Sequence, residues 1–383
     1  MIKIIKIILL FTLTFSLPLK EVIAEEKIKI GLLVPLTGKN SEIGQSIIKA
    51  TRLAINQINN SSIEIIPKDT ASSPEISLRS ARELSGLGVK IVIGPVFNEN
   101  LIYLDELNEI TFLSLTNKND GGSRNIINSG INATSQLNAI KKFLELKGIK
   151  KTIFLTPDVN YKSEVEHAIS SSKIKLIKNN VYNTDPTKLT QQIEKITNYK
   201  KRKQNLEDEI KRLEESNENN KERLIEKLKK KDTLGSVKFD SIIIADFDES
   251  LKSVTTSLLY TDISPKEKYF ITFNQWFDES LLKEKSSQPL YFPSINKKNY
   301  DNFSSEYFEK YNQYPNQLSF LSFDLVGLIY YLILQNNFSI DEKIFTKETL
   351  FKGKVGIFEI KNKKINHILN FYKVENSEFK KIF

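Results

Sequence analysis

Short apolar runs alternate with amphipathic helical segments along most of this chain, and this alternation restricts its fold more than any other feature. The run KIKIGLLVPL (27–36) is rich in strand-forming residues, and the segment that follows it, 41–59, carries Ile43, Ile47 and Ala54 at helical spacing. The same reading predicts strands at 27–36, 62–70, 90–96, 111–116, 151–157, 173–182, 238–247 and 268–275. It predicts helices at 41–59, 73–88, 98–108, 139–148 and 161–172, and a further helix that opens at Thr187.

Strands and helices that alternate at this pitch indicate βαβ units, with a parallel sheet covered by helices on both faces. Because the pattern runs through twice, we expect an α/β protein with two doubly wound halves. After these come a strand at 289–294 and helices around 302–313 and 321–334. The tail alternates with period two and turns near Asn362, which predicts a terminal hairpin.

One segment breaks this rhythm: about two residues in three are charged between 200 and 232. Leu206, Ile210 and Leu213 recur at helical spacing before the polar stretch ESNENN, and Leu224 and Leu228 recur after it. We therefore expect two antiparallel helices with coiled-coil-like packing. Two interpretations stay open, a charged hairpin that packs only on itself and a docking arm for a partner or an anionic surface.

The first 24 residues have the pattern of a cleavable signal peptide. Lys3 and Lys6 precede an apolar run that is too short to span a membrane comfortably, and Ala24 precedes the expected cleavage before Glu25. The alternative is an uncleaved membrane anchor. The chain has no Cys, which excludes disulfides and a lipobox attachment site. We expect a periplasmic protein with no transmembrane segment after the signal, because no later run reaches eighteen apolar residues.

The motifs of common enzymes are missing. Gly38-Lys39 suggests a phosphate-binding loop, but Leu33 stands where that motif needs its first glycine and Asn40 where it needs a hydroxyl. The two histidines, His167 and His367, have no second ligand at metal-binding spacing. We therefore expect neither catalytic residues nor a metal or cofactor. The net charge of +9 is dispersed along the chain, so nucleic acid is not an expected partner.

The remaining candidates lie where ligands bind in open α/β sheets, beyond the carboxyl ends of the strands. Asp246 ends a strong strand, where it could bind a ligand ammonium or cap the next helix. Tyr161 could stack on a ligand or serve the structure alone, and Trp276, the sole Trp, is expected to pack within the core or at a lobe edge.

The chain resembles the type I periplasmic binding proteins of the leucine-binding class. The resemblance rests on the opening 28–59, on IVIGPV, FLSLTN and TPDVNYKSEV, and on 311–332, all in the family's order. Within this superfamily it is most similar to the lipoprotein-type activators of penicillin-binding proteins. That resemblance rests on the charged segment closing on Asp232-Thr233-Leu234-Gly235 and on a tail with Gly353, Gly356 and Phe358.

The resemblance implies two Rossmann-like lobes with a ligand cleft between them. Lobe 1 would comprise 27–130 and 294–340, and lobe 2 would comprise 131–293 and 341–383, with the helical hairpin inserted at 187–232. In amino-acid-binding relatives, hydroxyls and amides of lobe 1 hold the carboxylate and an acid of lobe 2 holds the ammonium. The implied ligand residues here are Thr37, Gly38, Gly94, Pro95, Ser114, Thr116, Tyr161 and Asp246.

Two departures from the amino-acid-binding pattern stand out. The Ser/Thr pair expected after Gly94-Pro95 is replaced by Val96-Phe97-Asn98, and the Gly expected after Tyr161 is Lys162. The resemblance therefore implies a non-enzymatic periplasmic protein that activates a peptidoglycan synthase, a penicillin-binding protein, by contact. The alternative is the solute-binding subunit of a branched-chain amino-acid ABC transporter, with a permease as partner and a small polar ligand such as an amino acid.

Overall fold

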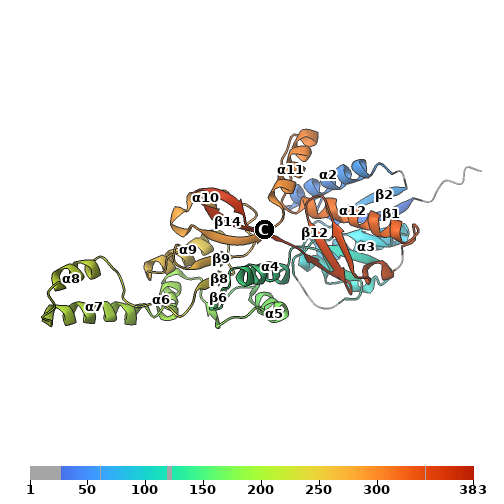
Figure 1. The fold of residues 1–383 in the computed structure, drawn as a ribbon. Helices are drawn as coiled ribbons and strands as arrows, with labels where there is room; N and C mark the ends of the chain where they lie inside the picture. Colours follow the sequence, from blue (N-terminus) through green and yellow to red (C-terminus); the bar gives the residue numbers. More distant parts are fainter. Residues whose placement is uncertain (1–26, 61, 119–122, 341) are drawn as a thin grey trace, which may run out of the picture.

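The computed structural model describes residues 27–60, 62–118, 123–340 and 342–383. The expected signal peptide lies outside these residues. Figure 1 shows two lobes side by side, each built on its own sheet, and a pair of helices that projects from the second lobe. The predicted α/β class is confirmed.

The first lobe contains a five-stranded parallel sheet in the order β2-β1-β3-β4-β5. Its strands are β1 (Ile28–Val34), β2 (Ile63–Asp69), β3 (Ile91–Ile93), β4 (Thr111–Ser114) and β5 (Ile126–Asn128). Successive residues of β1 face opposite sides, so Leu32 packs toward α2 (Ser41–Ile58) and Leu33 toward α3 (Pro74–Gly86). Helix α12 (Ser319–Gln335) packs beside α2, and α11 (Lys297–Tyr311) also contacts α2.

The predicted helix at 98–108 is wrong. The structure has two short 3₁₀ helices there, η1 (Asn98–Leu101) and η2 (Leu104–Glu106). Leu101 and Leu104 are both buried against α3, and their spacing of three residues fits the 3₁₀ repeat better than the α-helical one. Strand β5 was not predicted.

The second lobe contains a seven-stranded sheet in the order β15-β14-β10-β9-β8-β6-β7. Its strands are β6 (Thr152–Pro157), β7 (Lys178–Tyr182), β8 (Ser241–Ile244), β9 (Tyr269–Thr272), β10 (Leu290–Ser294), β14 (Asn370–Glu375) and β15 (Glu378–Lys381). Strands β6 to β10 are parallel, whereas β14 and β15 are antiparallel additions at one edge. Strand β7 begins five residues later than predicted.

Helices cover both faces of this second sheet. Helices α4 (Ala133–Leu146) and α5 (Lys162–Ser172) pack on one face, and α6 (Pro186–Ile196) and α9 (Asp248–Tyr260) pack on the other. Helix α4 begins at the Asn132 cap, six residues before its predicted start. The short helices α10 (Ser280–Lys283) and η3 (Lys285–Ser287) precede β10.

The tail divides between the lobes, and this corrects the predicted assignment of all of 341–383 to lobe 2. After η4 (Glu342–Phe345), strands β11 (Thr349–Lys352), β12 (Ile357–Lys361) and β13 (Lys364–His367) form a separate three-stranded antiparallel sheet. Asp324 of α12 accepts the backbone N–H groups of Lys354, Val355 and Gly356, which fixes the β11–β12 turn on lobe 1. The expected turn at Asn362 joins β12 to β13, with Asn362 and Lys363 both at positive φ.

The charged segment forms two helices, α7 (Tyr199–Glu215) and α8 (Lys221–Lys229), in contact with each other. Leu206 and Leu213 are buried, so the hairpin packs partly on itself. The predicted boundary at 187 is too early, because α6 packs in the core of lobe 2 through Leu189 and Ile193.

A buried arginine anchors the base of this hairpin. The Arg202 guanidinium donates to the carbonyl oxygens of Thr197 and Thr261 and to Thr233 Oγ1, and Thr233 in turn donates to Asp262. Leu234 N–H donates to the Arg202 carbonyl oxygen. The Asp-Thr-Leu-Gly segment singled out in the sequence is therefore the part of the chain that closes the hairpin onto lobe 2.

The chain crosses between the two sheets after β5, after β10 and after β13. His367, the last residue of β13, is fully buried at the third crossing. Its Nε2 lies 2.7 Å from the carbonyl oxygen of Ser129, which lies at the first crossing, and its backbone N–H donates to Ser135 Oγ of α4. One continuous apolar cluster contains α2 and α12 of lobe 1 together with α4 and α5 of lobe 2. The junction between the lobes is thus part of the core.

Candidate functional site

The loop after β1 carries Thr37 and Gly38, and an acid from the neighbouring strand holds it. Asp69, at the end of β2, accepts the N–H groups of Leu36, Thr37 and Ala71 and the Thr37 hydroxyl at 2.5 Å. Burial opposes ionisation of Asp69, but these hydrogen bonds outweigh it and lower the pKa of its carboxyl. Gly38 has a φ of +77°, so it supplies the turn into α2. Both predicted residues shape the loop.

Gly94 and Pro95 form the sharp turn at the end of β3. Gly94 has a φ of +109°, and a Cβ atom at this position would lie 2.1 Å from the Leu33 carbonyl oxygen. Only glycine fits here. The next residues, Val96 and Phe97, pack into the core of lobe 1. This loop therefore offers an aromatic side chain where relatives that bind amino acids would offer hydroxyls.

Ser114 ends β4 and Thr116 follows it, but both are buried, with exposed fractions of 0% and 6%. The Ser114 hydroxyl donates to the Pro95 carbonyl oxygen, and Thr116 Oγ1 accepts the Lys118 N–H. The Ser114 carbonyl oxygen also accepts both N–H and hydroxyl of Ser129. The Ser114 and Ser129 hydroxyls thus tie adjacent loops of lobe 1 together, whereas the Thr116 bond stays within one loop.

On lobe 2, the structure brings Tyr161 and Asp246 together at the carboxyl ends of β6 and β8. The Tyr161 hydroxyl donates to the Ala245 carbonyl oxygen at 3.2 Å and lies 3.5 Å from Asp246 Oδ1. Tyr182, at the end of β7, donates to Asp246 Oδ2 at 2.5 Å, and Phe247 N–H donates to Oδ1 at 2.9 Å. Both carboxylate oxygens of Asp246 are thus occupied from within the protein.

The electrostatics of this cluster follow from its burial. Asp246 is only 5% exposed, and burial raises the pKa of its carboxyl although the bonds from Tyr182, Phe247 and Tyr161 oppose the rise. Burial and the neighbouring Asp246 charge raise the pKa values of Tyr161 and Tyr182. The tyrosines therefore stay protonated donors at neutral pH.

Trp276 lies in the loop after β9, and its ring centroid is 6.0 Å from that of Phe320 at the start of α12. This contact joins the two lobes, in agreement with the predicted packing role. The surface hollows of about 170, 650 and 350 Å³ lie elsewhere, and none of the eight predicted ligand residues lines any of them. Within the described residues, no three His, Asp or Glu side chains gather as a metal site would require.

Comparison with known proteins now identifies the architecture. Residues 27–200 match the family model described as periplasmic binding protein. Similar solved structures each cover 93% of the chain. The fold is that of the type I periplasmic binding proteins. No curated protein matches the chain in sequence.

Three solved structures show the range of proteins that share this type I binding fold. A periplasmic ligand-binding protein of a branched-chain amino acid ABC transporter from Burkholderia xenovorans has a TM-score of 0.64 at 11% identity, covering 93% of this chain and 95% of that one. The C-domain of LpoA from Haemophilus influenzae, a regulator of PBP1A, has a TM-score of 0.61 at 15% identity, with 93% and 100% coverage. A leucine-binding protein from Thermotoga maritima has a TM-score of 0.55 at 15% identity, with 93% and 98% coverage.

Two residues that matter in this type I binding fold were missed in the sequence. Asp69 accepts the hydrogen bonds that hold the loop after β1, and Tyr182 donates a hydrogen bond to Asp246. Each stands at or near the carboxyl end of a predicted strand, so the rule that selected Asp246 would also have selected them. Among the described residues, no helix combines the length and apolarity needed to cross a membrane.

Proposed function

We propose that this is a non-enzymatic periplasmic protein that regulates a peptidoglycan synthase by contact, in the manner of the penicillin-binding protein activators. The proposal rests on the hydrogen bonds that the Asp246 carboxylate already accepts within the protein. Tyr182 and Phe247 N–H take both of its carboxylate oxygens, so it is poorly placed to receive a ligand ammonium. The Ser114 and Thr116 hydroxyls of lobe 1 are likewise buried, and the exposed Thr37 hydroxyl already donates to Asp69.

The energetic argument weighs these internal bonds against ligand affinity. A hydrogen bond to a charged group contributes about 1.5–3 kcal/mol. A ligand ammonium would have to compete with two such bonds, while a micromolar affinity corresponds to about 8 kcal/mol in all. Replacing the internal bonds of Asp246 would therefore consume a large part of the binding free energy. Polar groups that already form hydrogen bonds within the protein are more typical of a protein that acts by contact than of a solute-binding protein.

The similarity to the LpoA C-domain supports the same proposal, because the likeness spans that whole domain and 93% of this chain. The charged α7–α8 hairpin, held at its base by Arg202, is a candidate contact surface for the synthase. A hairpin that packs only on itself remains the other interpretation of this segment.

The second candidate is the solute-binding subunit of a branched-chain amino-acid ABC transporter, with a permease as its partner. It is favoured by one observation, the meeting of Tyr161 and Asp246 at one sheet edge, where an aromatic ring and an acid could face a ligand. Under this alternative, the ammonium of an amino acid would have to share Asp246 with Tyr182 and Phe247 N–H or displace one of them.

Cross-linking in the periplasm of the native host tests the proposal. Complexes captured with the full-length protein are washed at high salt and labelled with a fluorescent penicillin. We expect a labelled synthase to copurify. Capture of a permease with no labelled synthase would contradict the proposal. A variant lacking 204–229 keeps Arg202 and Thr233 at the hairpin base, and loss of the synthase from this variant alone would assign the contact to the hairpin.

A further inference from the structure

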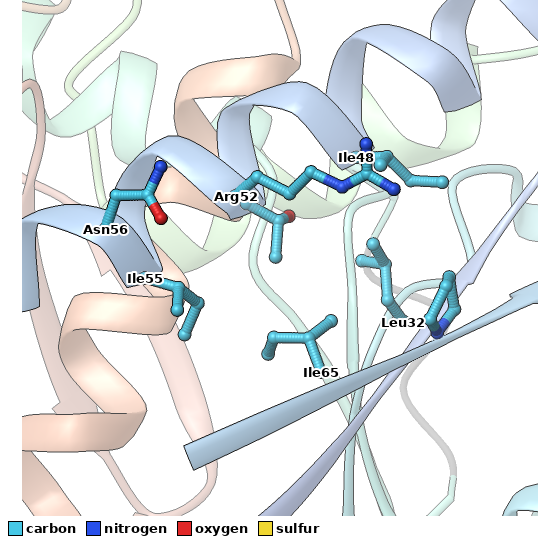
Figure 2. A pocket seen from close by; sticks show the side chains of 8 residues that line it. Leu32, Ile48, Arg52, Ile55, Asn56 and Ile65 are labelled. Atoms are coloured by element: carbon cyan, nitrogen blue, oxygen red, sulfur yellow. The ribbon is translucent and has the colours of Figure 1, made fainter. Parts of the chain in front are cut away.

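A separate hollow of about 170 Å³ lies on lobe 1 between α2 and the strands β1 and β2, away from the loops described above. Its floor is formed by Leu32, Ile48 and Thr51, which are all at least nine-tenths buried. Ile55 and Ile65 form walls, and Figure 2 shows these side chains converging below the helix. The Thr51 hydroxyl donates to the Ile47 carbonyl oxygen, so the floor presents no free hydrogen bond donor.

The rim of this hollow is polar and positively charged. Arg52 and Asn56 project from α2, and Figure 2 shows the Arg52 side chain extended along the helix with its guanidinium beside Ile48. Among the residues that the structure describes, no carboxylate pairs with Arg52. An arginine without a paired carboxylate, at the rim of an apolar hollow, can bind an anionic group of a ligand.

The sequence explains why Arg52 lacks an acid. On a helix, its neighbours at spacings of three and four are Ile48, Lys49, Ile55 and Asn56. Across the hollow, alternation along β2 turns Ile63 and Ile65 toward α2 and puts Glu64 on the opposite face. Asp69 shares that face at the end of β2, but its carboxylate is held by the loop after β1, so neither element pairs a carboxylate with Arg52 and the positive charge is left for a ligand.

The dimensions limit the apolar part of that ligand. An apolar cavity of about 150 Å³ is large enough to hold benzene, so this hollow accommodates a chain of about five or six carbons. A guanidinium binds a carboxylate through two parallel hydrogen bonds. A ligand ammonium, by contrast, would find no acid at the rim.

We propose that this hollow binds a short aliphatic monocarboxylate, with its alkyl chain against Ile48, Ile55 and Ile65 and its carboxylate on Arg52. The ligand class excludes free amino acids, because their ammonium group would lie next to the guanidinium. The proposal is independent of the function proposed above, since it uses a different face of lobe 1 and none of the loops at the sheet edge.

The test compares 4-methylpentanoate with L-leucine, which has the same carbon skeleton and an added ammonium, and with 4-methylpentan-1-ol, which lacks the charge. Saturation-transfer NMR on the full-length protein measures binding of each. We expect 4-methylpentanoate to bind with a Kd on the order of 1 mM and the other two to bind at least about tenfold more weakly.

Substitutions then locate the site. Arg52→Gln removes the charge and leaves a shorter, neutral polar side chain, so we expect at least about a tenfold loss of 4-methylpentanoate affinity. Ile65→Phe fills the hollow and should also abolish binding. Arg79→Gln on α3, an exposed arginine on the other face of the sheet, is the matched control and should leave binding unchanged.

Three results would overturn the proposal. One is the absence of 4-methylpentanoate binding at tens of millimolar to the folded wild-type protein. Another is unchanged affinity in Arg52→Gln. The third is equal binding of the alcohol, because it would remove the role of the charge.

Discussion

Acidification should destabilise this protein through His367, the buried histidine at the crossing between the lobes. Burial lowers the pKa of its imidazole from 6.5 to about 4, although the bond to the Ser129 carbonyl oxygen opposes the change. Nε2 donates to that oxygen, and Nδ1 is buried without a partner. Phe358 packs against the ring at 4.7 Å, and no described carboxylate pairs with it. A proton on Nδ1 would therefore leave an uncompensated charge in the core.

The sign and size of the effect follow from proton linkage. The unfolded chain binds a proton near pH 6.5 and the folded protein only near pH 4, so the stabilising contribution is complete above 6.5 and is lost as the pH falls toward 4. Integrating this proton linkage predicts that the free energy of unfolding falls by about 2 kcal/mol at pH 5 and about 3 kcal/mol at pH 4, relative to pH 7.

Asp324 acts in the opposite direction and must be separated from His367. Burial raises the pKa of the Asp324 carboxyl to about 7, although the backbone N–H groups of the β11–β12 turn oppose the rise. The Asp324 carboxyl therefore binds a proton more tightly in the folded protein than in the unfolded chain. Its contribution to the free energy of unfolding grows as the pH falls from 7 toward 4. The wild-type pH profile alone mixes both effects, so the difference between wild type and a His367 variant is the informative quantity.

Urea unfolding followed by circular dichroism at pH 7, 6, 5 and 4 measures this difference. His367→Gln retains an N–H donor for Ser129 but does not titrate. Relative to wild type, we expect its free energy of unfolding to improve by about 3 kcal/mol between pH 7 and pH 4. His167→Gln removes the only other imidazole, from an exposed position on α5, and serves as the control. A difference that stays flat for His367→Gln would refute the reasoning.

Two further substitutions test contacts that hold the tail and the hairpin. In Gly353→Ala the new Cβ would lie 2.5 Å from the Asp324 carboxyl carbon and displace it from the turn, which should cost about 2–4 kcal/mol in urea unfolding. Gly86→Ala, where a Cβ meets open space, should be neutral or slightly stabilising, and equal losses in both variants would contradict the clash. Arg202→Gln strands the buried carbonyl oxygens of Thr197 and Thr261 and should cost about 2–4 kcal/mol, with faster hydrogen exchange at the hairpin base. Arg212→Gln, at an exposed position, should leave the unfolding midpoint nearly unchanged. A loss as large as that of Arg202→Gln would contradict the stabilising role given to the buried Arg202 hydrogen bonds.

Most of the fold could be predicted from patterns among residues that are close in the sequence. The buried strands β1, β6 and β8 are continuous apolar runs because helices cover both faces of each sheet, and such runs are visible without any tertiary information. The turn at Asn362 also followed from period-two alternation on either side of it. Elements whose structure depends on neighbours close in the sequence were therefore predictable.

The errors in the tail and at the site depend on contacts between distant residues. The tail divides because β14 pairs with β10, roughly eighty residues earlier, while Asp324 holds the β11–β12 turn on the other lobe. Neither pairing leaves a periodic signal in the tail itself. The same limit applies to the site. Asp246 could be placed at a strand end from the sequence, but its hydrogen bond from Tyr182 depends on the register of β7 beside β6, which pairs Tyr182 with Pro157.

The most direct test of the central claim is a calorimetric and thermal-shift titration of the full-length protein with the standard amino acids. Because Asp246 and the lobe 1 hydroxyls already have hydrogen bond partners within the protein, we predict no heat of binding and no stabilisation at millimolar ligand. A branched-chain or other amino acid that binds at about 10 μM would stabilise the protein by about 2.7 kcal/mol at 1 mM ligand. Such stabilisation, abolished by Asp246→Asn, would contradict the account and establish a solute-binding protein.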